Sequence, residues 1–139
     1  MKQYRVAILG ASGAVGQEMM KILAERSFPV GELRLLASRN SAGKEINGHV
    51  VVEACRENFE GLDIILGAAE NDIAERFVDD IKASGAVFID NSSAFRLCPD
   101  VPLVVPEINP EDVKKHKGVI ANPNCTTVIS CTAVNALNA

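Results

Sequence analysis

The chain has 139 residues and a formal net charge of −4, with a pI near 5.2. This acidic balance gives no general electrostatic case for binding nucleic acid or an anionic membrane. No apolar run approaches the roughly 20 residues that span a bilayer, and the N-terminus leads into a strand pattern without a signal-peptide core. We therefore expect a cytoplasmic protein in which residues 1–139 form one domain.

The four cysteines and two histidines show no metal-binding pattern. The cysteines have no C-x-x-C spacing, and a zinc site normally draws on paired cysteines and histidines. We therefore expect reduced thiols and no metal site. His49 and His116 have no ligand partners at suitable spacing, so both are interpreted as surface groups.

The chain begins with a predicted strand, glycine-rich turn and helix. Residues 5–9 are a predicted strand, because after Arg5 they form a continuous apolar run, typical of a strand buried on both faces. An amphipathic helix is predicted over 17–26. In a dinucleotide-binding turn, Gly10 would allow the tight turn, Gly13 would admit a pyrophosphate and Gly16 would let helix and strand pack closely. The spacing departs by one residue from G-x-G-x-x-G, and an ordinary tight turn is the alternative.

The next apolar run, 33–37, is a predicted strand that ends in Ser38 and Arg39. An NAD-binding domain usually has an Asp or Glu about 20 residues beyond the glycine motif, where it binds the ribose 2′-hydroxyl. Ser38 and Arg39 occupy that place here, so we expect NADP in preference to NAD. A solvated loop arginine is the alternative for Arg39.

Strands and helices alternate through the rest of the chain. This alternation implies right-handed βαβ units and a Rossmann-like doubly wound α/β fold, with a mainly parallel sheet and helices on both faces. Ligands of such sheets gather beyond the carboxyl ends of the strands. Further strands are expected around 50–52 and at 62–67, 86–90 and 119–121, with a helix over 71–85 and a short helix from Asn109 to about Gly118.

Two residues beyond strand ends have reactive or ligand-binding side chains. Arg96 follows the strand at 86–90, and a guanidinium binds carboxylate or phosphate through paired hydrogen bonds; a structural ion pair is the alternative. Cys125 follows the strand at 119–121 and begins an apolar helical run. A helix N-terminus favours a thiolate and lowers the pKa of a thiol, so Cys125 is a candidate nucleophile. A buried structural cysteine is the alternative.

Three motifs together resemble the N-terminal, cofactor-binding part of aspartate-β-semialdehyde dehydrogenase, across essentially the whole chain. They are Gly10-Ala11-Ser12-Gly13-Ala14-Val15-Gly16, Asp90-Asn91-Ser92-Ser93-Ala94-Phe95-Arg96 and Asn122-Pro123-Asn124-Cys125-Thr126-Thr127. The resemblance implies the reversible, NADP-dependent reductive dephosphorylation of an aspartyl phosphate to aspartate semialdehyde, a step in lysine, threonine and methionine biosynthesis.

The resemblance also implies roles for individual residues. Cys125 would form an acyl-thioester, Asn124 would orient the small-molecule substrate, and Arg96 would bind phosphate. The cofactor contacts implied by the resemblance and by the turn are Gly10, Ser12, Gly13, Ala14, Val15, Gly16, Ser38, Arg39, Asn40 and Ser41.

The family continues beyond the position of Ala139 into a substrate and dimerisation domain that carries a general-base histidine. We therefore expect a fragment that is inactive alone, from an enzyme that is a homodimer or homotetramer when complete. One alternative is an N-acetylglutamyl-phosphate reductase-like enzyme, against which the form Asn-Pro-Asn-Cys-Thr-Thr argues. The other is a stand-alone NADP-binding or redox-sensing module.

Overall fold

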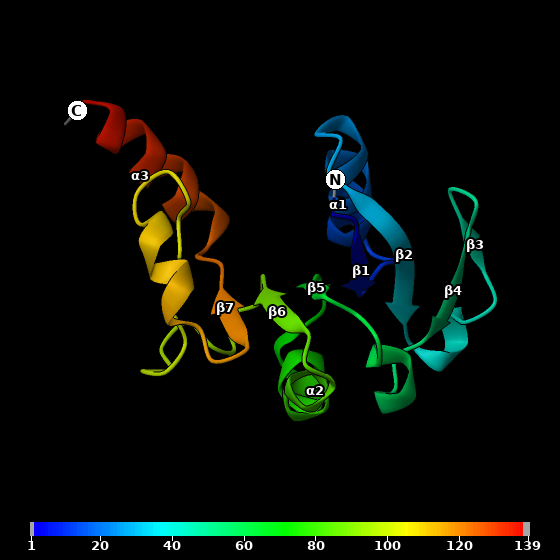
Figure 1. Cartoon of the computed structure of the whole chain (residues 1–139). Helices are drawn as coiled ribbons and strands as arrows, with labels where there is room; N and C mark the ends of the chain where they lie inside the picture. Colours follow the sequence, from blue (N-terminus) through cyan, green and yellow to red (C-terminus); the bar gives the residue numbers. More distant parts are fainter. Residues whose placement is uncertain (1, 138–139) are drawn as a thin grey trace.

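The computed structural model describes residues 2–137, which fold around a seven-stranded sheet with the order β3-β4-β2-β1-β5-β6-β7 (Figure 1). All neighbouring strands are parallel except β3 and β4. The predicted mainly parallel α/β fold is therefore confirmed. The elements are β1 (Tyr4–Leu9), α1 (Ala14–Glu25), β2 (Val30–Ala37), η1 (Arg39–Ser41), β3 (Glu45–Ile46), β4 (His49–Glu53), η2 (Arg56–Phe59), β5 (Ile64–Gly67), α2 (Asn71–Ser84), β6 (Val87–Asp90), η3 (Pro110–Lys115), β7 (Val119–Ala121) and α3 (Cys125–Leu137).

Met1, Asn138 and Ala139 lie outside the described residues. The helical run expected from Cys125 is therefore described only as far as Leu137. Within residues 2–137, no helix is both long enough and apolar enough to cross a membrane.

Strand β1 lies at the centre of the sheet. Its residues 6–9 are fully buried, because the sheet is covered on both faces at this strand. It pairs in parallel with β2 on one side and with β5 on the other. The chain thus builds the sheet outward from β1 in one direction through β2 and β4, and then in the other through β5, β6 and β7. This reversal places the topological switch point between β1 and β5.

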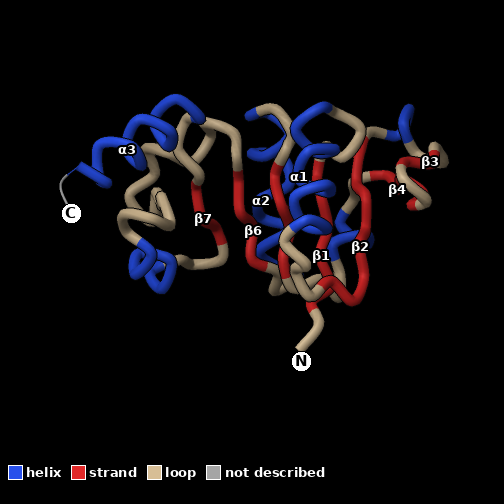
Figure 2. Tube along the Cα trace, turned by 90° about the horizontal axis from the view of Figure 1, so that it is seen from above, coloured by secondary structure: helices blue, strands red, loops and turns tan. Residues whose placement is uncertain are grey.

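Two apolar cores lie on opposite faces of the sheet. Met20 of α1 packs with Ile8 and Leu35 on one face, while Phe77 of α2 packs with Leu9 and Phe88 on the other. Figure 1 shows α1 and α2 on the two sides of the strands. Viewed from the α1 side, β7 and α3 lie at one end of the sheet and the β3–β4 hairpin at the other (Figure 2).

The helix boundaries follow local glycine chemistry. Helix α1 begins at Ala14, earlier than predicted, because the turn is already closed by a 3.1 Å hydrogen bond from the Gly13 N–H to the Gly10 carbonyl. Helix α2 ends as predicted at Gly85, whose left-handed φ of 83° suits a glycine C-cap. The predicted helix from Asn109 to about Gly118 is a shorter 3₁₀ helix, η3.

The β3–β4 hairpin is an element that the sequence analysis missed. Its two-residue loop is Asn47-Gly48, with positive φ at both residues, 49° and 80°. Asn-Gly between short strands is the strongest local signal for such a hairpin, because both residues adopt left-handed backbone at low cost. The expected strand around 50–52 is its second arm, β4.

Candidate active site

In the first turn, a different geometric feature favours glycine at each of the three glycine positions. Gly10 has φ +88°, and a Cβ at this position would lie 2.6 Å from the Ala68 carbonyl oxygen. A Cβ at Gly16 would lie 2.6 Å from the Gly10 carbonyl oxygen and 2.7 Å from the Ala11 Cα. At Gly13 the nearest atom to such a Cβ is 3.5 Å away, so the protein itself leaves this position open. This is the pattern that a dinucleotide turn requires, with space at the central glycine for a pyrophosphate.

The N-terminus of α1 also suits an anion. Gly13 is the N-cap, no side chain caps the helix, and its first turn has no acidic residue. The first N–H groups of a helix have no intrahelical partners, and the macrodipole adds positive potential there. The Gln17 side chain donates to the Ser12 carbonyl at 3.3 Å, which fixes the turn against the helix. The residues present therefore fit the pyrophosphate of a nicotinamide dinucleotide.

A cavity of about 440 Å³ lies at the switch point, beyond the ends of β1 and β5. Five of the predicted cofactor residues line it, whereas Ala14, Val15, Gly16, Asn40 and Ser41 lie outside its lining. The full lining is Leu9, Gly10, Ser12, Gly13, Ala37, Ser38, Arg39, Glu53, Ala54, Ala68, Ala69, Glu70, Ile73, Arg76 and Phe77.

Several walls of this cavity were missed by the sequence analysis. Ala54 and Ala68 directly follow β4 and β5, so the strand-end rule would have found them. Arg76 comes from α2, where its guanidinium lies 4.9 Å from the centre of the Phe77 ring, and no local signal placed it there. Glu53 is opposite Ala37 in the β2–β4 register, which brings a carboxylate next to the Ser38 and Arg39 turn.

Arg96 lies in a network that joins two strand ends. Its Nε donates to the Asn122 carbonyl and its Nη2 to the Asn91 carbonyl, both at 2.9 Å. The Asn122 side-chain amide donates to the Asn91 side-chain oxygen. Within residues 2–137 Arg96 has no salt bridge, so the alternative of a structural ion pair is not supported. Among the same residues its Nη1 has no hydrogen-bond partner, and this leaves a donor available for an anion.

Cys125 is the first residue of α3 and is exposed. The alternative of a buried structural cysteine is therefore wrong. Asn124 precedes it, and its side-chain oxygen accepts the Thr126 N–H at 3.0 Å, which caps the start of the helix. Asn122 connects this turn to Arg96, so the predicted anion group and the predicted nucleophile belong to one connected edge of the sheet.

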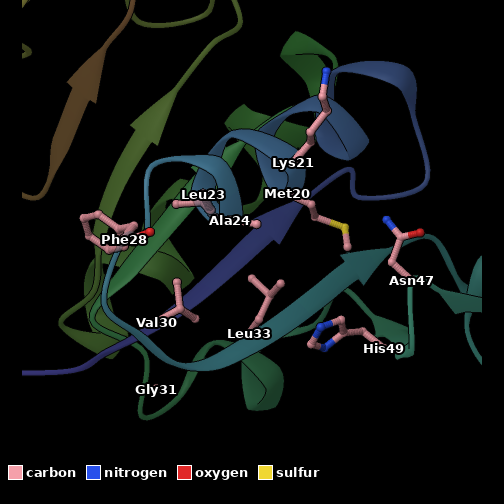
Figure 3. Close-up of a pocket in the computed structure, with 11 residues that line it drawn as sticks. Met20, Lys21, Leu23, Ala24, Phe28, Val30, Gly31, Leu33, Asn47 and His49 are labelled. Carbon is pink, nitrogen blue, oxygen red and sulfur yellow. The ribbon is translucent and has the colours of Figure 1, made fainter.

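A larger cavity of about 650 Å³ lies elsewhere, between α1, β2 and the β3–β4 hairpin. Figure 3 shows its floor formed by Val30 and Leu33, with Lys21 pointing away from them. Lys21 pairs with two glutamates of its own helix, at 3.4 and 3.8 Å. A small-molecule site needs a few polar groups that converge on the ligand. The rest of the polar lining of this cavity, Ser27, Asn47 and His49, belongs to none of the predicted motifs. The smaller cavity includes the glycine turn and the Ser38-Arg39 turn, so it is the better candidate.

The histidines and cysteines do not assemble into a cluster. Within residues 2–137, no group of three or more His, Cys, Asp or Glu side chains is arranged to bind a metal ion. His49 and His116 are half-buried, and Nδ1 of His116 accepts the Gly118 N–H at 3.0 Å. Both side chains are therefore partly exposed, and their interpretation as surface groups stays a prediction.

Comparisons of the chain with a family model, with curated proteins and with solved structures all identify semialdehyde dehydrogenases. The family model described as semialdehyde dehydrogenase, NAD binding domain, matches residues 5–116. The chain is 51% identical over 138 residues to the aspartate-semialdehyde dehydrogenase of Synechocystis sp., covering 96% of this chain and 41% of that protein. The chain spans about two fifths of the length of the curated relatives it matches.

Two solved structures are similar in fold and sequence. The first is aspartate semialdehyde dehydrogenase II from Vibrio cholerae complexed with ASA, with a TM-score of 0.89, 42% identity and coverage of 98% of this chain and 46% of that one. The second is aspartate semialdehyde dehydrogenase with NADP from Candida albicans, with a TM-score of 0.78, 26% identity and coverage of 96% and 46%.

Proposed function

The chain belongs to the semialdehyde dehydrogenase NAD-binding domain family, and from this membership we propose that it carries the cofactor site and nucleophile of an NADP-dependent aspartate-semialdehyde dehydrogenase. The reaction is the reversible reductive dephosphorylation of an aspartyl phosphate to aspartate semialdehyde. The observation that carries the proposal is the bond from the Arg96 Nε to the Asn122 carbonyl, because it joins an anion-binding side chain to the turn that leads to the exposed Cys125.

The cofactor is bound by the first turn and by the end of β2. The open position at Gly13 and the free N–H groups of α1 receive the pyrophosphate. Ser38 and Arg39 bind the 2′-phosphate of NADP from the cavity wall, and Asn40 and Ser41 continue this contact from η1. When bound, the nicotinamide supplies or accepts the hydride.

The chain's own groups perform the acyl transfer. In the biosynthetic direction the Cys125 thiolate attacks the carbonyl carbon of the acyl phosphate. A carbon–sulfur bond forms, the carbon–oxygen bond to phosphate breaks, and phosphate leaves with both electrons of that bond. Nη1 of Arg96 stabilises the negative charge on the phosphate. Asn124 uses its side-chain oxygen as the helix cap, so its NH₂ group is the part that orients the substrate.

One experiment tests the cofactor assignment. We expect Arg39→Ala to weaken NADP binding about 10- to 100-fold while changing NAD binding little, since a charged hydrogen bond contributes roughly 1.5–3 kcal/mol. Glu53→Gln is the matched control. Glu53 lines the same cavity and is opposite Ala37, next to the turn, but its carboxylate is not a group that binds phosphate. An Arg39→Ala protein whose ratio of NADP to NAD affinity matches the wild type would refute the role of Arg39.

A second experiment tests the nucleophile. The chain is incubated with aspartyl phosphate, from which the Cys125 thiolate is acylated without hydride transfer and without a general base, and it is then quenched with acid and mapped by peptide mass. We expect one aspartyl group on Cys125 and none in Cys125→Ser, while Cys98→Ser, which removes another exposed thiol, keeps the adduct. An adduct that persists in Cys125→Ser, or a chain that binds NADP yet forms none, contradicts the proposed function.

A further inference from the structure

Asp90 is the only charged side chain that is fully buried within residues 2–137. It is the last residue of β6, at the edge of the sheet where the site lies. Its Oδ1 is buried and has no hydrogen-bond partner in the described part of the chain. Burying an unpaired polar oxygen costs free energy, so stability alone does not explain a carboxyl at this position.

The neighbouring strand leaves room for this side chain. Gly67 is opposite Asp90 in the β5–β6 register. A Cβ on Gly67 would lie 2.6 Å from Oδ1 of Asp90 and 2.8 Å from the ring of Phe88. The φ of Gly67 is not in the left-handed region, so backbone geometry does not require glycine here. Glycine is required here because the Asp90 carboxyl and the Phe88 ring occupy the space that a side chain would need.

The other oxygen of Asp90 connects to the loop beyond the strand. The Ser92 hydroxyl donates to Oδ2 at 2.5 Å, and the same hydroxyl oxygen accepts the Ala94 N–H at 3.2 Å. The carboxyl therefore fixes the first turn of the segment that ends at Arg96. The backbone of Asp90 contributes as well, since its carbonyl accepts the Asn122 N–H at 2.8 Å.

The two carbonyls that accept hydrogen bonds from Arg96 belong to Asn91 and Asn122, and each of these residues is bonded to Asp90. Asn91 is its chain neighbour and accepts Nη2 of Arg96, while Asn122 donates to the Asp90 carbonyl and accepts Nε. These two bonds fix the plane of the guanidinium. A shift of the turn at Asn91 would rotate that plane and move Nη1.

We propose that Asp90 is the positioning residue of the anion site, acting through the Ser92 hydroxyl to fix the turn whose Asn91 carbonyl orients Arg96. The inference rests on the proposed function in one respect, the assignment of Arg96 as the phosphate-binding group. Burial raises the pKa of Asp90, opposed by the hydrogen bonds from Ser92 and by the charge of Arg96. In Asp90→Asn the side chain keeps its shape and still offers an oxygen to the Ser92 hydroxyl.

The test is the hydrogen exchange of the Arg96 Nε–H, measured by NMR on the ¹⁵N-labelled chain. We expect Asp90→Ala to accelerate this exchange about ten-fold, the loss of roughly one hydrogen bond, and Asp90→Asn to stay near the wild type because its amide oxygen still accepts the Ser92 hydroxyl. A folded Asp90→Ala with wild-type exchange overturns the proposal, and so does equal acceleration in both variants. If Asp90→Ala does not fold, Ser92→Ala takes its place and the same two outcomes decide.

A ligand titration separates this inference from the proposed function. Inorganic phosphate is added while the Arg96 signals are followed, and NADP affinity is measured in parallel. We expect Asp90→Ala to weaken phosphate binding about ten-fold, with NADP affinity unchanged, because the cofactor cavity has no wall from residues 90–96. Wild-type Arg96 signals that do not respond to phosphate refute its phosphate-binding role, while the exchange rates still decide the role of Asp90.

Discussion

Replacing Gly16 by alanine should lower the free energy of unfolding of the chain. The new Cβ would lie 2.6 Å from the Gly10 carbonyl oxygen and 2.7 Å from the Ala11 Cα, and both are backbone atoms that no side-chain rotation can move. Helix α1 must then shift away from the turn, and such over-packing costs about 1–3 kcal/mol. For 139 residues the unfolding entropy is about 0.3 kcal/mol/K, so thermal unfolding followed by circular dichroism should show Tm lowered by ~3–10 °C.

Gly13→Ala is the matched control in the same turn. Its Cβ meets nothing closer than 3.5 Å, and its φ of −82° suits alanine. The gain from a less flexible unfolded chain, about 0.4–1 kcal/mol, offsets a small loss at the N-cap, so Tm should change little. NADP should bind about 10-fold or more weakly, because the methyl group occupies the approach of the pyrophosphate. Equal Tm losses in the two variants, with NADP affinity intact in Gly13→Ala, would refute this division of roles.

Three further outcomes are expected. Iodoacetamide should label Cys125 faster than Cys98 near neutral pH, although both are exposed, because only Cys125 begins a helix; peptide mapping that shows the reverse order contradicts the proposed nucleophile. The hydrogen bond from the Arg5 side chain lowers the pKa of Asp63, so this pair stabilises the fold above the ordinary aspartate pKa of about 3.9 and is lost as the pH falls through the lowered value. Asp63→Asn should therefore flatten the acid side of a pH–Tm curve, and an unchanged curve would show that the pair contributes nothing. Phe59→Ala should cost about 3–5 kcal/mol in urea unfolding, because the ring is fully buried, and a loss below about 1 kcal/mol would show that the core closes over the gap.

Local chemistry explains which parts of the site were predictable. Gly16 meets backbone atoms of its own turn and Gly10 has a left-handed φ in that turn, so their spacing in the sequence predicted this part of the geometry, whereas the contact of Gly10 with Ala68 depends on the neighbouring strand. Arg76 reaches the cavity only because α2 packs under the sheet, and tertiary packing leaves no local pattern. In the sequence, Asp90 has the pattern of a polar residue at the end of a strand. Its burial depends on the absence of a side chain at Gly67, which belongs to another strand. The Asn47-Gly48 hairpin had a local signal that was overlooked.

The central place of β1 has a consequence for how the protein is made. Its apolar residues 6–9 leave the ribosome before β5, at 64–67, and one of the two edges of β1 finds its partner only when β5 has followed. At roughly 5–20 residues per second, the intervening stretch takes about 3–12 s to synthesise. Throughout that interval the nascent chain exposes an unpaired apolar strand edge, the feature that most readily pairs with another chain. Among the described strands, β1 is therefore the one whose edge waits longest for its partner during synthesis.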